Sequence, residues 1–121
     1  MARVLAVDDE RDVLSLIALT LELDGHEVMK ASDGMQGLQL ARKELPDLIV
    51  LDVMMPKMDG LTTLRQLRED SSTRDVPVLL LSAKAQSLDI EVGMKAGAVG
   101  YMTKPFDPED LSKEVARIIG G

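Results

Sequence analysis

Short apolar runs alternate along this sequence with longer segments in which apolar residues recur at helical spacing. Unbroken apolar runs predict strands that are covered on both faces, because a half-exposed strand would alternate apolar and polar side chains. Strands that alternate with helices form βα units around a parallel sheet. The predicted strands are Val4–Val7, Glu27–Ala31, Leu48–Leu51, Val78–Leu81 and Val99–Met102.

Helices are predicted between and after these strands, with leucine, isoleucine, valine and alanine on their inner faces. Five βα units in 121 residues are too few for a closed barrel, which needs ~200 residues or more, and they favour an open doubly wound sheet with helices on both faces. The predicted helices run over about residues 10–23, from Ser32-Asp33-Gly34 to before Pro46, through Leu61, Leu64 and Leu67, over about residues 86–96, and after Pro108.

Composition narrows the functions open to the chain. The length of 121 residues predicts a single domain over residues 1–121, and the 2% aromatic content predicts an aliphatic core. A net charge of −7 repels nucleic acid and anionic membrane, so we expect no direct contact with either. The sequence has no cysteine, no signal peptide and no run of ~20 apolar residues, which makes a soluble cytoplasmic protein the expectation.

Acidic, hydroxyl and basic side chains stand where the predicted strands end. They are Asp8-Asp9, Asp52, Ser82 and Thr103-Lys104-Pro105. In an open parallel sheet these strand ends lie at one edge, where ligands bind. Two carboxylates about 4 Å apart repel by roughly 4 kcal/mol at an effective dielectric constant near 20, so a bound cation and Lys104 would be needed to offset the repulsion. Carboxylate ligands without histidine or cysteine favour Mg²⁺, with Mn²⁺ as the alternative.

Each of these residues also has a simpler explanation when it is taken alone. An aspartate after a strand often caps a helix or forms a turn, and Ser82 would serve as a cap for the following helix. A lone lysine such as Lys104 is most often solvated. Capping does not explain why acids, a hydroxyl and a lysine follow adjacent strands of one sheet, so the combination favours a functional site.

The sequence closely resembles the receiver domain of two-component response regulators. The resemblance covers essentially the whole chain, and its motifs occur in the same order at suitable intervals. They are Val7-Asp8-Asp9-Glu10, the segment from Pro46 to Gly60 around Asp52, Ser82-Ala83-Lys84, and Tyr101-Met102-Thr103-Lys104-Pro105-Phe106. The resemblance implies the flavodoxin-like strand order 2-1-3-4-5, of which receivers are a known example.

The resemblance also implies roles for the acidic residues. Asp52 would be the phosphoacceptor, and a Mg²⁺ ion would be held by Asp9, Asp52, the backbone carbonyl of Met54, and Asp8 through a water. Transfer would then depend on positioning and electrostatics. Such a domain is not a turnover enzyme, because its chemistry is its own Mg²⁺-dependent phosphorylation and slow dephosphorylation.

The remaining implied roles concern the response to phosphorylation. Lys104, aimed by a cis bond to Pro105, would pair with Asp52 at rest and with the phosphoryl group afterwards. Ser82 would donate its hydroxyl to the phosphoryl group, and Tyr101 would change rotamer as Ser82 moves. This switch would remodel the face formed by the fourth helix, the fifth strand and the fifth helix.

The expected partners are a sensor histidine kinase or histidine phosphotransfer protein, and an output protein or domain that the sequence does not identify. Many receivers of transcription factors carry acidic residues just before the tyrosine. Here Val99-Gly100 occupies that place, which weakens an inference of dimerisation through this face. No output domain follows before Gly120-Gly121, so we expect a stand-alone receiver or one cut from a larger protein.

Two other functions fit parts of the pattern. A pseudo-receiver that is never phosphorylated is disfavoured because the acids, the hydroxyl and the lysine are all present. A phosphohydrolase of the haloacid dehalogenase type also uses a nucleophilic aspartate and Mg²⁺, but it needs a second carboxylate two residues after the nucleophile, where this chain has Met54.

Overall fold

One five-stranded parallel sheet, in the order β2-β1-β3-β4-β5, organises the chain. The computed structural model describes residues 1–84 and 86–120. The strands are β1 (Arg3–Val7), β2 (Glu27–Ala31), β3 (Leu48–Asp52), β4 (Val78–Ser82) and β5 (Gly100–Thr103). The helices are α1 (Arg11–Leu23), α2 (Gly34–Glu44), α3 (Gly60–Glu69), α4 (Ser87–Lys95) and α5 (Pro108–Gly120). The predicted fold and strand order are confirmed.

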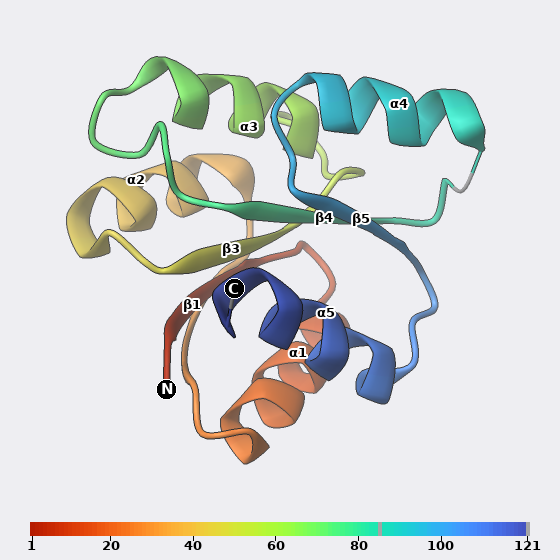
Figure 1. The fold of residues 1–121 in the computed structure, drawn as a ribbon. Helices are drawn as coiled ribbons and strands as arrows, with labels where there is room; N and C mark the ends of the chain where they lie inside the picture. The colour runs from red at the N-terminus through yellow and green to blue at the C-terminus, as the bar shows by residue number, and fades with distance from the viewer. Residues whose placement is uncertain (85, 121) are drawn as a thin grey trace.

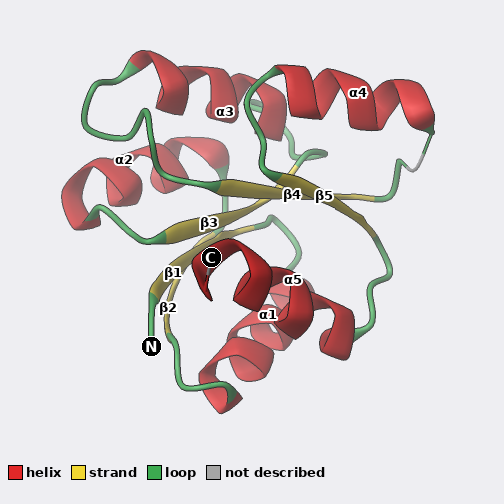
Figure 2. Cartoon of the chain, viewed as in Figure 1, coloured by secondary structure: helices red, strands yellow, loops and turns green. Residues whose placement is uncertain are grey.

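Helices cover both faces of the sheet, with α1 and α5 on one side and α2, α3 and α4 on the other (Figure 1, Figure 2). Successive residues of a strand point to opposite faces. In β1, Leu5 and Val7 therefore pack under α2 and α3, while Val4 and Ala6 pack against α1 and α5. Because both faces are buried, the central strands β3 and β4 are apolar over residues 48–51 and 78–81.

The observed elements depart from the prediction mainly at their ends. β3 and β4 each extend one residue further, to include Asp52 and Ser82. The backbone ladder continues there, with Asp52 opposite Leu81 and Ser82 opposite Thr103. Strands pair through backbone groups. A residue with a polar side chain can therefore remain in a strand as long as the adjacent strand still pairs with it. β5 begins and ends one residue later than predicted. Among the helices that the structure describes, none is long and apolar enough to cross a membrane.

α4 lies close to the sheet through a glycine. Gly93 is the buried residue of this helix, and a Cβ atom at Gly93 would lie 2.8 Å from Leu80 Cδ1 and 3.2 Å from a ring carbon of Tyr101. On the same helix, in contrast, Leu88 is 69% exposed and Val92 is 38% exposed. α4 therefore packs on β4 and β5 mainly through Gly93.

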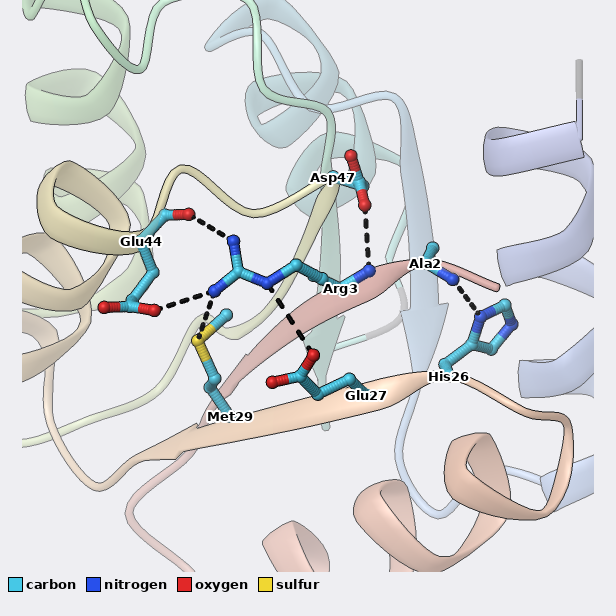
Figure 3. A network of polar contacts seen from close by, with 7 residues as sticks. All are labelled: Ala2, Arg3, His26, Glu27, Met29, Glu44 and Asp47. Carbon is cyan, nitrogen blue, oxygen red and sulfur yellow. Dashed lines mark hydrogen bonds and ion pairs between the residues drawn. The ribbon is translucent and has the colours of Figure 1, made fainter.

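A polar network joins the amino end of β1 to neighbouring elements, at the edge of the sheet opposite Asp8 and Asp52 (Figure 3). The Arg3 guanidinium donates hydrogen bonds of 2.7 Å to the carbonyl and to a carboxylate oxygen of Glu44, at the end of α2. Asp47 accepts from the backbone N–H of Arg3, and His26 Nδ1 accepts from that of Ala2. His26 thus has a structural contact at the opposite end of the strands from Asp8 and Asp52.

The end of α2 offers a test of backbone strain. Leu45 caps this helix in the left-handed conformation, with φ 45°, and its side chain is 52% exposed. Left-handed backbone costs a residue with a Cβ roughly 1 kcal/mol, whereas glycine adopts it freely. We predict that Leu45→Gly raises the free energy of unfolding by about 0.5–1 kcal/mol in urea titrations. Leu45→Ala is the control, and a glycine variant no more stable than it would contradict the prediction.

Candidate functional site

The polar strand-end residues meet at the carboxyl edge of the sheet. Asp8 follows β1, Asp52 and Ser82 end β3 and β4, and Lys104 follows β5. β2 lies next to β1 on one side and β3 lies next to it on the other. The connections that leave the carboxyl ends of these strands therefore diverge beside β1. Such a point is the usual ligand-binding position in doubly wound sheets.

Lys104 is the centre of an ion-pair cluster. Its side chain is 12% exposed, and its Nζ lies 2.7 Å from Asp8 Oδ2, 3.2 Å from Asp52 Oδ1 and 3.3 Å from Glu10 Oε1. Asp8 and Asp52 are both buried, whereas Glu10 is exposed. One cation therefore compensates two buried carboxylates, and the cluster keeps an excess of negative charge.

Two buried carboxylate oxygens have unused hydrogen-bonding capacity. Asp8 Oδ1 accepts from the backbone N–H of Glu10, and Asp52 Oδ1 from that of Met54. Within residues 1–84 and 86–120, no hydrogen bond reaches Asp8 Oδ2 or Asp52 Oδ2, although the former is close to the Lys104 ammonium. Buried carboxylate oxygens without donors are costly unless a cation compensates them.

The donor set at this edge fits Mg²⁺. Oxygens of Asp8, Asp9 and Glu10 lie within 4.8 Å of one another. With the unpartnered oxygen of Asp52 they offer hard oxygen ligands of the kind that Mg²⁺ prefers. Asp9 and Glu10 are exposed, so this side of the cluster is open to solvent and to an incoming ion.

Burial and the charges of neighbouring residues change the acidity of Asp52 and Lys104. Burial, with the nearby charge of Asp8, raises the pKa of Asp52 to about 6, although Lys104 and the Met54 N–H act in the opposite direction. Burial alone would lower the pKa of the Lys104 ammonium, but Asp8 and Asp52 outweigh burial and raise this pKa. Asp52 is thus a carboxylate whose ionised form depends on nearby positive charge.

Gly60 positions the loop that follows Asp52. The structure shows a close approach at this glycine: a Cβ atom at Gly60 would lie 2.2 Å from the carbonyl oxygen of Asp52 and 2.7 Å from Val53 Cα. The Gly60 N–H donates to the carbonyl of Val53. The carboxyl group of Asp59 caps α3 by accepting from the N–H of Thr62.

Ser82 and Tyr101 meet at the backbone of one residue. The buried Ser82 Oγ accepts from the N–H of Lys84 at 3.0 Å, and the Tyr101 hydroxyl donates to the carbonyl of Lys84 at 2.9 Å. Ser82 makes no hydrogen bond with Asp52 among the described residues. The half-buried ring of Tyr101 packs against the core under α4.

The structure therefore brings most of the predicted site residues to one edge and adds one more. Asp8, Asp52 and Lys104 are in contact, and Asp9 lies beside Asp8. Glu10 was expected at the start of a helix and as part of the motif Val7-Asp8-Asp9-Glu10, with no role of its own in the site, yet it pairs with Lys104. Its position directly after two aspartates is the signal that could have identified it. The bond that precedes Pro105 is cis, as expected.

Comparison with known proteins identifies the family of this chain. Residues 4–116 match the model of the response regulator receiver domain. The chain belongs to this family. The receiver is 40% identical to the protein PilH of Pseudomonas aeruginosa over the full length of both chains. It is 43% identical to the DNA-binding dual master transcriptional regulator RpaA of Synechocystis sp., over 98% of this chain and 49% of RpaA.

Solved structures agree with this assignment. The chemotaxis protein CheY4 of Vibrio cholerae matches the receiver with a TM-score of 0.92 and 37% identity, over 98% of each chain. The BeF3-activated receiver domain of DrrB matches with a TM-score of 0.89 and 30% identity, over 100% of this chain and 99% of the other. The receiver spans about half the length of RpaA and of the regulator PhoP of Bacillus subtilis, but the whole of PilH.

Family membership establishes the general role of the domain. Receiver domains of two-component response regulators signal by phosphorylation, as phosphoacceptors rather than turnover enzymes. They act between histidine kinases and output partners. Among the described residues, the acidic cluster around Asp8 is in keeping with the Mg²⁺ that receivers generally bind.

The raised pKa of Asp52 makes stability depend on pH. Its folded pKa of about 6 exceeds the ordinary value of 3.8, so the stabilisation present below about pH 4 is lost as the pH rises through 6. An asparagine at this position stays neutral at every pH. Without Mg²⁺, we predict that Asp52→Asn is more stable than wild type by about 2–3 kcal/mol at about pH 8 and nearly equal at about pH 3.5. Urea unfolding measures both values, and a difference independent of pH would contradict the prediction.

Proposed function

We propose that Asp52 accepts a phosphoryl group and that its modification switches the face formed by α4, β5 and α5. The observation that carries the proposal is the position of Asp52, which is buried 3.2 Å from Lys104 at the ligand-binding edge with one oxygen free of hydrogen bonds from the described residues. A structural aspartate at a strand end would be expected to use both oxygens in caps or ion pairs.

The proposed step is an in-line transfer. An oxygen of ionised Asp52 attacks phosphorus and forms a P–O bond, giving an acyl phosphate. The P–N bond of a donor phosphohistidine breaks and leaves its electron pair on the imidazole, or the P–O bond of a small acyl phosphate breaks and releases the carboxylate of that donor. The side chain of Asp52 must be ionised to attack, and the Lys104 ammonium favours this form.

The metal site would be formed by residues next to the nucleophile. Asp9, Asp52 and the backbone carbonyl of Met54 would hold Mg²⁺, with Asp8 acting through a water. When bound, the ion would neutralise charge on the transferred phosphoryl group. Lys104 would then move from its present partners toward the phosphoryl oxygens. Its Nζ is already within 3.3 Å of three carboxylates, so the required shift is small.

The hydrogen bonds at Lys84 support a switch. Ser82 would donate its hydroxyl to the phosphoryl group, and its present contact with the Lys84 N–H would be strained or lost as it moves. The carbonyl of Lys84 accepts a hydrogen bond from the Tyr101 hydroxyl. A shift of Lys84 would therefore either break this bond or move the Tyr101 ring with it. Because α4 packs through Gly93 against that ring, the change would reach the α4 surface. A nearly complete switch requires a bias of about 5.5 kcal/mol.

The proposed partners follow from the same chemistry. A phosphohistidine on a sensor kinase or a histidine phosphotransfer protein would be the donor, in the cytoplasm, where response regulators generally act. An output protein or domain would recognise the switched face. A net charge of −7 disfavours direct contact of this domain with nucleic acid.

Phosphorylation at Asp52 can be tested directly. We predict that acetyl phosphate with Mg²⁺ adds one phosphoryl group to the wild-type protein and none to Asp52→Asn, measured by intact mass. Asp47→Asn is a matched control, because Asp47 contacts Arg3 at the opposite edge of the sheet. This control is expected to be phosphorylated like wild type. An adduct that persists in Asp52→Asn would refute the assignment.

A second test concerns the lifetime of the acyl phosphate. Met54 and Lys84 each lie two residues beyond a site residue, both are exposed, and they line one hollow together with Val53 and Leu61. In that place their side chains would limit access of water to the phosphoryl group. We predict that replacing both with alanine speeds dephosphorylation about 3- to 10-fold, a barrier change of about 1 kcal/mol. An unchanged rate, followed by loss of the mass adduct, would show that these side chains do not shield the phosphate.

A further inference from the structure

We propose that Gly34, the first residue of α2, is a positioning residue for the phosphorylation site. Its lack of a side chain allows α2 to lie directly against the segment 53–59, which joins Asp52 to α3. A Cβ atom at Gly34 would lie 2.5 Å from Thr63 Oγ1, 3.0 Å from the carbonyl oxygen of Met58 and 3.1 Å from Met58 Cγ. This inference rests on the proposed function, because it concerns how the metal and the phosphoryl group are placed.

The start of α2 is a firm surface. The carboxyl group of Asp33 accepts from the N–H of Gln36 at 2.8 Å. The Gln36 side-chain oxygen accepts in return from the N–H and the hydroxyl of Ser32. The preceding strand β2 is tied to the site through Ala31, whose carbonyl accepts from the N–H of Asp8. These reciprocal bonds leave the first turn of α2 little freedom to retreat.

Segment 53–59, which faces the start of α2, is held by hydrogen bonds and close contacts. Thr63 is buried, and its hydroxyl donates to the carbonyl of Asp59 at 2.9 Å. The N–H of Met58 donates to the carbonyl of Pro56, and Lys57 between them has a φ of 68°. At the far side, Gly60 lies against the carbonyl of Asp52. Segment 53–59 is thus confined between the start of α2 and the end of β3.

Added bulk at position 34 would therefore be transmitted to the site. The direct clash is with Thr63 Oγ1, and the Met58 carbonyl, four residues from the Met54 carbonyl proposed as a metal ligand, would have to shift by a few tenths of an ångström. Backbone atoms cannot rotate away as a long side chain can. A misplacement of about 1 Å at a catalytic constellation can cost up to about 100-fold in rate. The glycine hence serves the geometry of the metal ligand, whereas alanine would be the better helix former at this position.

The test compares three variants with wild type. Gly34→Ala crowds the contact, and Gly34→Ala with Thr63→Ala removes the nearest clashing group. Ala41→Gly is the control, because it weakens α2 at a buried residue two turns from the contact. Isothermal titration calorimetry measures the affinity for Mg²⁺ alone, and intact mass follows phosphorylation by acetyl phosphate. Thermal unfolding reports stability separately.

We expect Gly34→Ala to weaken Mg²⁺ binding and slow phosphorylation, each by about 10-fold. Ala41→Gly should lower stability and leave both properties near wild type, and the double variant should recover part of each. Equal losses in Gly34→Ala and Ala41→Gly, an unaltered Gly34→Ala, or no recovery in the double variant would overturn the inference. If wild type itself were not phosphorylated, the proposed function would fail first.

Thr63→Ala alone keeps the test decisive if Gly34→Ala does not fold. This variant opens the same contact rather than crowding it, and it removes one hydroxyl and one methyl group without creating a clash. It should loosen segment 53–59 and weaken Mg²⁺ binding by about 3-fold, a smaller effect than crowding because the backbone contact of Gly34 with Met58 remains. Mg²⁺ affinity equal to that of wild type would count against the inference.

Discussion

Two aspartates, Asp8 and Asp52, are buried at one edge of the sheet and share one lysine. Removing a carboxylate from water is costly unless positive charge replaces its hydration. Lys104 supplies one such charge to both, so the cluster stays too acidic, and the pKa of Asp52 rises to about 6. This imbalance explains why the site fits a divalent cation and why the protonation of Asp52 responds to the charge around it.

The fold makes that imbalance possible by bringing distant segments together at fixed distances. Parallel strands place their carboxyl ends at one edge, and close backbone contacts then fix the connecting segments. Gly60 lies so close to the end of β3 that a Cβ atom would not fit, and a Cβ atom at Gly34 would clash with Thr63 and press on Met58. Rigid support of this kind matters because positioning and electrostatics provide most of the catalysis in phosphoryl transfer.

The contacts that connect Ser82 to the α4 surface are fewer than those that hold the acidic cluster together. Ser82 and Tyr101 both bond to the backbone of Lys84, one through its N–H and one through its carbonyl. α4 packs on the ring of Tyr101 and on β4 through Gly93. A helix held by few buried groups can change position at low free-energy cost, whereas α1 and α5 bury leucine, isoleucine and valine side chains against the sheet. The same chain thus combines a closely packed site with a helix, α4, that has only one buried residue among those the structure describes.

The strands, the two helical layers and the edge that gathers Asp8, Asp52, Ser82 and Lys104 were all predictable from the sequence. Apolar runs and helical spacing are local patterns, and a parallel sheet brings strand ends together whatever lies between them. Only the tertiary structure decided that Lys104 also pairs with Glu10 and that Gly34 lies in close contact with Thr63. Such contacts depend on the distances between elements far apart in the chain, and local sequence patterns do not specify those distances.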